Sequence, residues 1–89
     1  MPANIKTTAN AVGVVPAYAN VKACDFVVNG TFVGTWQFQA LLNDEWVAIA
    51  EGTAGGQYLD VRFADARQVR FAVTAYTSGT LGFNLAGRN

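Results

Sequence analysis

The chain has 89 residues, which is enough for one domain and too few for two. It contains no histidine and one cysteine, which excludes an intrachain disulfide, a Cys/His zinc site and Ser-His or Cys-His nucleophile pairs. Six basic and six acidic residues cancel, and charged residues make up only 13% of the chain, against about 25% in an average domain. The sequence therefore predicts a protein that is not an enzyme and needs no cofactor.

Residues 1–20 carry almost no charge and lack helical spacing, and Pro16 confines any strand here to an edge or an end. We expect an extended N-terminal arm lying on a neighbouring subunit, or an edge strand, with a frayed terminus as the alternative. The candidate partner contacts in this segment are Ile5, Val12, Val14 and Val15. The apolar run 11–15 is shorter than a signal-peptide core of about 7–15 residues, so we expect an unsecreted, uncleaved chain.

From Val21 onward, short apolar stretches alternate with turn residues and predict strands. Asn29-Gly30 predicts a type I′ hairpin turn, and Asn43-Asp44 predicts a second tight turn. The segment 64–68 is ambiguous, because it also fits a single helical turn. The expected strands cover residues 21–28, 31–42, 45–50, 57–63, 67–76 and 80–86.

A period of two runs through these strands and indicates one buried face. The last two strands are expected to form a hairpin around Ser78-Gly79. The residues expected to face inward include Trp36, Phe38, Leu59, Val61, Phe63, Val69, Phe71, Val73, Ala75, Leu81, Phe83 and Leu85. The predicted fold is all-β: a single small antiparallel β-sandwich, or a jelly-roll-like barrel, of about six or seven strands over residues 21–89, preceded by the arm.

The candidates for binding chemistry have simpler structural explanations. The acidic residues lack the spacing of a calcium loop, and Cys24 is expected to pack as a small apolar residue. Four aromatic residues could stack on a sugar, namely Trp36, Trp46, Tyr58 and Tyr76. Trp36 alternates with core residues, whereas Tyr76 lies near the Ser78-Gly79 turn and is the most plausible exposed contact, although a structural hydroxyl hydrogen bond is also expected there.

Two segments carry a resemblance to a known family. Asn29-Gly-Thr-Phe-Val-Gly-Thr-Trp-Gln-Phe-Gln39, followed by Trp46, is the first, and Arg67-Gln-Val-Arg-Phe-Ala-Val-Thr-Ala-Tyr-Thr-Ser-Gly-Thr80 is the second. Over roughly residues 27–86 the chain resembles a short β-sandwich module of tailed-bacteriophage virions, found in capsid decoration (cement) proteins, head-fibre bases and tail-associated modules. The resemblance transfers no catalytic residue, and its motifs indicate the fold more firmly than the role.

The resemblance implies a non-enzymatic structural protein of a phage particle, most specifically a capsid decoration protein that stabilises the head. It would reside in the virion after assembly in the bacterial cytoplasm, with the major capsid or tail protein as its partner. The alternative is a carbohydrate- or host-surface-binding tail or fibre module. The 52% apolar content and zero net charge favour a homo-oligomer, a trimer being one option. Dispersed basic residues and short apolar runs predict no nucleic-acid and no membrane partner.

Overall fold

The computed structural model describes residues 4–88, with side chains for residues 4–15 and 20–88. Within this range the chain is all-β and contains no helix, and six strands form one antiparallel sheet in the order β1-β6-β2-β5-β3-β4. The strands are β1 (Asn4–Ala9), β2 (Gly13–Asn29), β3 (Phe32–Leu42), β4 (Glu45–Gly52), β5 (Gly56–Gly79) and β6 (Leu81–Arg88). The predicted fold class, a small antiparallel β-sandwich or barrel, is confirmed.

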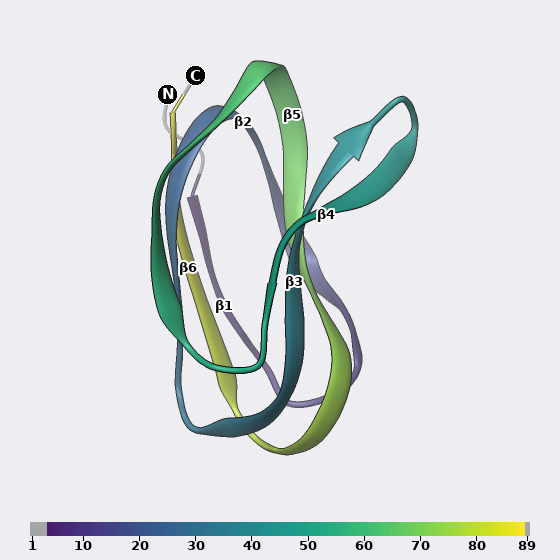
Figure 1. Cartoon of the computed structure of the whole chain (residues 1–89), viewed down its shortest axis with the longest axis vertical. Helices are drawn as coiled ribbons and strands as arrows, with labels where there is room; N and C mark the ends of the chain where they lie inside the picture. The colour runs from purple at the N-terminus through teal and green to yellow at the C-terminus, as the bar shows by residue number, and fades with distance from the viewer. Residues whose placement is uncertain (1–3, 89) are drawn as a thin grey trace.

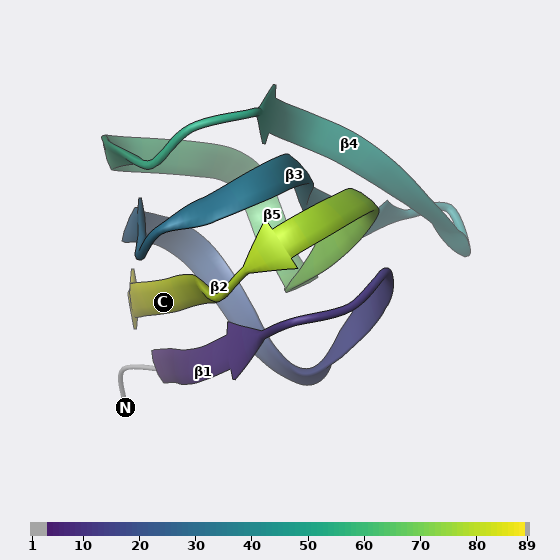
Figure 2. The ribbon, with the colours of Figure 1, turned by 90° about the horizontal axis from the view of Figure 1, so that it is seen from below.

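The two long strands, β2 and β5, turn this single sheet into two layers (Figures 1 and 2). Between the pairs Val21–Arg67 and Ala23–Arg62, one residue of β2 lies opposite four residues of β5, and both strands bend there. One layer contains β1, β6, the second half of β2 and the first half of β5. The other contains the first half of β2, the second half of β5, β3 and β4.

Aromatic rings fill the space between the layers. Phe26 of β2 packs on Phe38 of β3 with 4.5 Å between ring centroids, and Phe71 of β5 stacks on Phe83 of β6 at 4.5 Å. Such pairs add to the free energy gained by burying the rings. The fully buried side chains include Trp36, Phe26, Phe38, Phe71, Phe83, Ile5, Leu81, Leu85, Val21, Val28, Val69 and Val73. Most of the core positions predicted from the alternation are therefore confirmed.

The predicted hairpin at Asn29-Gly30 is wrong. β2 and β3 are not neighbours, because β5 lies between them in the sheet, and the connection crosses from one layer to the other. Gly30 has a φ of 98°, but Asn29 does not have the positive φ that a type I′ turn requires. That geometry occurs instead at the second predicted turn, where Asn43 and Asp44 have φ values of 50° and 64° and join β3 to β4.

The predicted hairpin around Ser78-Gly79 is also wrong, since β5 and β6 belong to different layers. The chain crosses between them where the Thr80 amide donates a hydrogen bond to the Thr31 carbonyl over 2.9 Å. Gly79 has a φ of 92°, and a Cβ on it would collide with the Thr31 carbonyl oxygen. Two layer crossings, β2 to β3 and β5 to β6, are therefore bonded together.

A bulge in β5 corrects the predicted inward face of residues 57–63. Asp60 has a φ of 57°, and between the pairs Phe26–Tyr58 and Cys24–Val61 the strand β5 carries one more residue than β2. Such a bulge reverses the alternation of side chains. Leu59 therefore faces outward and is 67% exposed, while Tyr58 and Val61 pack against the core. The ambiguous segment 64–68 continues β5 as a strand.

The N-terminal segment lies within the sheet. β1 is an edge strand paired with β6, and Gly13 to Asn20 is the first half of β2, so the expected boundary between residues 20 and 21 falls inside a strand. A register shift in β2 surrounds Pro16, which has no N–H to donate. Residues 1–3 of the expected arm lie outside the described residues.

Candidate protein-interaction surfaces

One end of the molecule is built from the four connections that cross between the layers. These connections are residues 10–12, 30–31, 53–55 and Thr80. The strand pairs Ala9–Leu81, Val28–Gly56 and Phe32–Gly79 bring the connections to the same end. We call this region, with its adjoining strand ends, the uncharged end.

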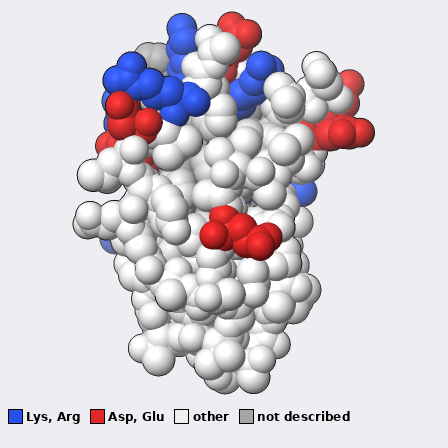
Figure 3. Space-filling view, in the orientation of Figure 1, with Lys and Arg blue, Asp and Glu red and all other residues white. Residues whose placement is uncertain are grey.

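The uncharged end takes its character from four stretches of sequence. Residues 7–21, 26–43, 52–59 and 71–87 contain no Lys, Arg, Asp or Glu. Figure 3 shows the result: charged side chains gather at the opposite end, and the lower part of the molecule is without them on the visible face. Large apolar side chains are exposed along these stretches, with Val12 at 62%, Val33 at 58% and Val14 at 49%.

The structure separates the five predicted partner contacts. Ile5 and Val15 are only 2% and 3% exposed and belong to the core, so the prediction that they contact a partner is wrong. Both were assigned to a free arm, whereas β1 and β2 carry them into the sandwich. Val12 and Val14 are exposed near the uncharged end. Tyr76 is half-buried against the core, and its hydroxyl donates a hydrogen bond to the Gly79 carbonyl over 2.7 Å.

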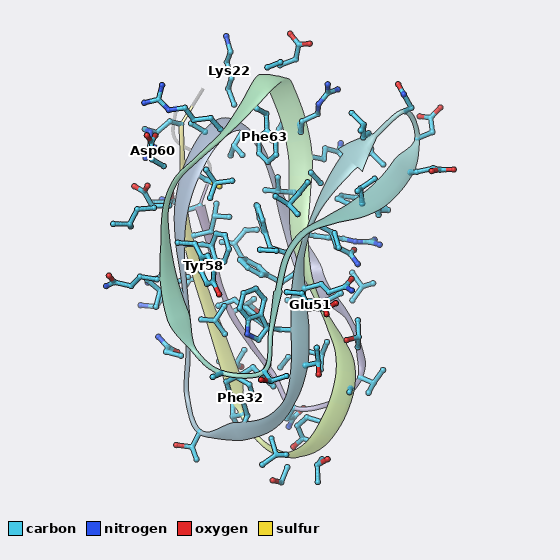
Figure 4. All side chains as sticks on the ribbon, in the orientation of Figure 1. Lys22, Phe32, Glu51, Tyr58, Asp60 and Phe63 are labelled. Atoms are coloured by element: carbon cyan, nitrogen blue, oxygen red, sulfur yellow. The ribbon has the colours of Figure 1, made fainter. Side chains whose placement is uncertain are left out.

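The opposite, charged end holds a surface ion-pair network. Arg88 binds Asp25 at 2.8 Å and Asp60 at 3.4 Å, and Arg62 binds Asp60 at 2.8 Å. The Asp60 amide also donates to Asp25 over 2.7 Å, which ties the β5 bulge to β2. The hydrogen bond from Arg88, followed by that from the Asp60 amide, holds the pKa of Asp25 below its usual range. In Figure 4, Lys22, Asp60 and Phe63 are labelled at this end.

The outer face of β3, β4 and β5 carries a continuous polar ladder. Gln37 donates to Glu51 over 2.7 Å, Gln39 donates to Gln37 over 3.0 Å, and Arg70 donates to Gln39 over 2.8 Å. The Arg70 guanidinium lies 4.0 Å from the centroid of the Trp46 ring. Burial lowers the pKa of Arg70 below its ordinary value. Arg70, expected from the sequence to pair with an acid, thus bonds an amide and covers an indole.

The other aromatic candidates are committed to the interior. Trp36 is fully buried, and its indole N–H donates to the Ala54 carbonyl over 3.0 Å. Tyr58 stacks on Phe26 at 4.7 Å and lies edge-on to Trp36 at 5.4 Å. Of the four predicted stacking residues, Trp46 is therefore the one with a ring on the outer face of the sheet.

Neither the cysteine nor the acidic residues form a recognisable reactive centre. Cys24 is buried, and burial, followed by the charge of Asp25, raises the pKa of its thiol to about 11. A neutral thiol is a poor nucleophile. Among residues 4–88, no group of three His, Cys, Asp or Glu side chains could hold a metal ion. The same range contains no helix long and apolar enough to cross a membrane.

A second apolar surface was missed in the sequence. The β3–β4 hairpin extends beyond the core, and Leu42, Val47 and Ile49 on it are 43%, 37% and 46% exposed. The available signal was the Asn43-Asp44 turn, which is flanked by apolar residues on both sides. The alternation could not show that the opposite layer ends before the hairpin does.

No protein-family model, no curated protein and no solved structure matches this chain. The surfaces described above therefore carry the functional argument.

Proposed function

We propose that this chain is a non-enzymatic structural protein of a tailed-phage particle, most specifically a capsid decoration protein that attaches by its uncharged end. The observation that carries the proposal is the segregation of charge: four crossing connections form one end of the sandwich from sequence stretches without a charged residue. The resemblance of residues 27–86 to phage virion modules supplies the phage assignment.

An uncharged end suits burial against another protein. The centres of protein interfaces are depleted of charged residues, because a charge that loses its water must find a partner. The exposed valines at positions 12, 14 and 33 would gain from burial, and the Thr, Asn and Ser side chains around them can exchange water for hydrogen bonds. The charged end would remain in solvent and keep the decorated particle soluble.

The proposed mechanism is mechanical. A standard interface buries about 800 Å² on each partner, and apolar area contributes about 25 cal/mol per Å², from which the cost of association is subtracted. One decoration protein that contacts two neighbouring lattice subunits would therefore resist their separation. Repetition over the shell turns a modest free energy per site into a large stabilisation of the particle.

The first test is the copy number in purified particles. Hundreds of copies per particle are expected for a decoration protein, whereas a few copies would indicate the tail. The second test adds purified protein to depleted particles and compares Val12→Arg with Ala66→Arg. Ala66 is also exposed but lies at the bend of β5, away from the crossings. Val12→Arg should lose occupancy at least tenfold while Ala66→Arg binds as wild type; equal binding by both variants would contradict the proposal.

The carbohydrate-binding tail or fibre module is retained as the second candidate because of the outer-face ladder. Amides, Arg70 and an indole on one face are the groups with which proteins bind sugars, but the Arg70 guanidinium already covers Trp46. Saturable glycan binding that Trp46→Ala abolishes would support this function. We expect no saturable binding, because a sugar would have to displace the arginine.

A further inference from the structure

The β3–β4 hairpin projects from the body as an arm, seen at the upper right of Figure 1. Along the inner face of this arm, exposure rises abruptly: Ala40 is 3% exposed, whereas Leu42 is 43% exposed. The next apolar side chains, Val47 and Ile49 on β4, are also exposed. The arm thus extends the sandwich with one layer only.

A groove runs beside the arm where the opposite layer stops. It has a volume of about 260 Å³, and the bend of β5 forms its other wall with Phe63 and Ala64. Arg62 and Arg67 also line it. The groove therefore combines apolar walls with two basic side chains.

The two edges of the sheet differ in their protection against strand pairing. Edge strand β1 has six residues and carries Lys6 near its centre, a charge of the kind that discourages pairing with another chain. Edge strand β4 has Trp46-Val-Ala-Ile-Ala50 at its centre, without a charge or a proline. The protruding arm is thus also the less protected edge (Figure 2).

We propose that the groove is occupied by the β3–β4 hairpin of a second copy of this chain, in a two-fold symmetric dimer. The inference deepens the proposed function and rests on it, since it names the contact between copies on the particle. A two-fold interface requires a surface that complements itself. Laid face to face, each arm covers the Leu42, Val47 and Ile49 side chains of the other.

Charge decides for a second copy over another apolar partner. The tip of the arm is acidic, with Asp44 and Glu45, and the groove at its base carries Arg62 and Arg67. In the face-to-face arrangement each acidic tip reaches the basic groove of its partner. Within the described part of the chain, neither Glu45 nor Arg67 takes part in an ion pair, whereas Arg62 is held by Asp60. Glu45 and Arg67 are therefore the pair expected to form between copies.

Sedimentation equilibrium of the full chain, up to about 1 mM, tests the proposal; a dissociation constant of 1 mM corresponds to only about 4 kcal/mol of binding free energy. The wild type is expected to dimerise in this range, and Val47→Arg and Ile49→Arg should each remain monomeric with unchanged circular dichroism. Glu45→Arg and Arg67→Glu should each weaken the dimer at least tenfold, and the double variant should restore it. A wild type that stays monomeric, or a double variant no better than the single ones, would overturn the proposal.

The matched control is Val12→Arg, which places the same side chain at the uncharged end. It should dimerise as wild type and fail to bind particles, whereas Val47→Arg should bind particles as a monomer. The two proposals can thus fail separately. If the wild type is monomeric and Val47→Arg loses particle binding, the groove takes a lattice subunit and the second copy is refuted as its occupant.

Discussion

Replacing Trp36 by alanine tests the centre of the sandwich on which both surfaces depend. The side chain is fully buried, contacts Phe26 and Tyr58 edge-on at 6.1 and 5.4 Å, and lies against Gly52, where an added Cβ would come within 2.8 Å of the ring. Little can collapse into the space it leaves, so the cost should be about 3–5 kcal/mol. At roughly 0.05–0.15 kcal/mol per residue, the whole domain is stable by only about 4–13 kcal/mol.

Urea unfolding followed by far-ultraviolet circular dichroism measures the loss. With a slope of about 1–3 kcal/mol/M, the midpoint of Trp36→Ala should fall by about 1 M or more, or the variant should not fold. Trp36→Phe keeps most of the packing and loses the bond to the Ala54 carbonyl, which costs about 1 kcal/mol.

Trp46→Ala is the matched control, because the same truncation there removes an Arg70 contact on the outer face worth about 0.5–1 kcal/mol. Equal midpoint shifts for Trp36→Ala and Trp46→Ala would refute the assignment of Trp36 to the core and the strand register that places it there.

Three further outcomes are expected. Ile5→Ala should lower the free energy of unfolding by about 2–5 kcal/mol, because β1 buries this side chain in the core; an unchanged midpoint would free β1 from the sheet. The folded-state pKa of Asp25 lies below the ordinary 3.8, so its stabilisation is present above that pH and is lost as the pH falls through the lowered pKa; Asp25→Asn should flatten the acid side of a midpoint-against-pH profile. The pKa of Cys24 is raised from 9.0 to about 11, so the folded state keeps a proton that the unfolded state releases, and stability should decline between pH 9 and 11; Cys24→Ala should decline less over that window, and a thiol reagent at pH 8 should label wild type only after unfolding.

The sequence was informative about faces and weak about neighbours. Alternation in residues 69–73 and 81–85 placed nearly every core side chain correctly, because an L-residue strand must point successive side chains to opposite faces. The same residues gave no information on whether the two segments pair with each other. Proximity in sequence favours a hairpin at Ser78-Gly79, but the chain crosses to the other layer, where Phe83 stacks on Phe71.

Positive φ angles explain the remaining errors. Asn29-Gly30 and Asn43-Asp44 both suit tight turns, and only the pairing of the flanking strands distinguishes them. At Asp60 the φ of 57° depends on a bond from its own amide to Asp25, which is 35 residues away in sequence. No local pattern contains that partner, so the outward position of Leu59 could not be predicted. The hairpin groove was missed for the same reason, since its walls come from β3, β4 and the bend of β5.

The four layer crossings have a consequence for how the chain folds. Apart from β3 and β4, no two consecutive strands pair with each other, so nearly every ladder must close a long loop before it gains a hydrogen bond. Proteins dominated by such distant pairings fold in milliseconds to seconds rather than microseconds. Because β2 and β5 each belong to both layers, neither layer can assemble as a unit ahead of the other. Folding and unfolding should accordingly be slow and all-or-none, a property suited to a protein that must hold its shape for the lifetime of a particle.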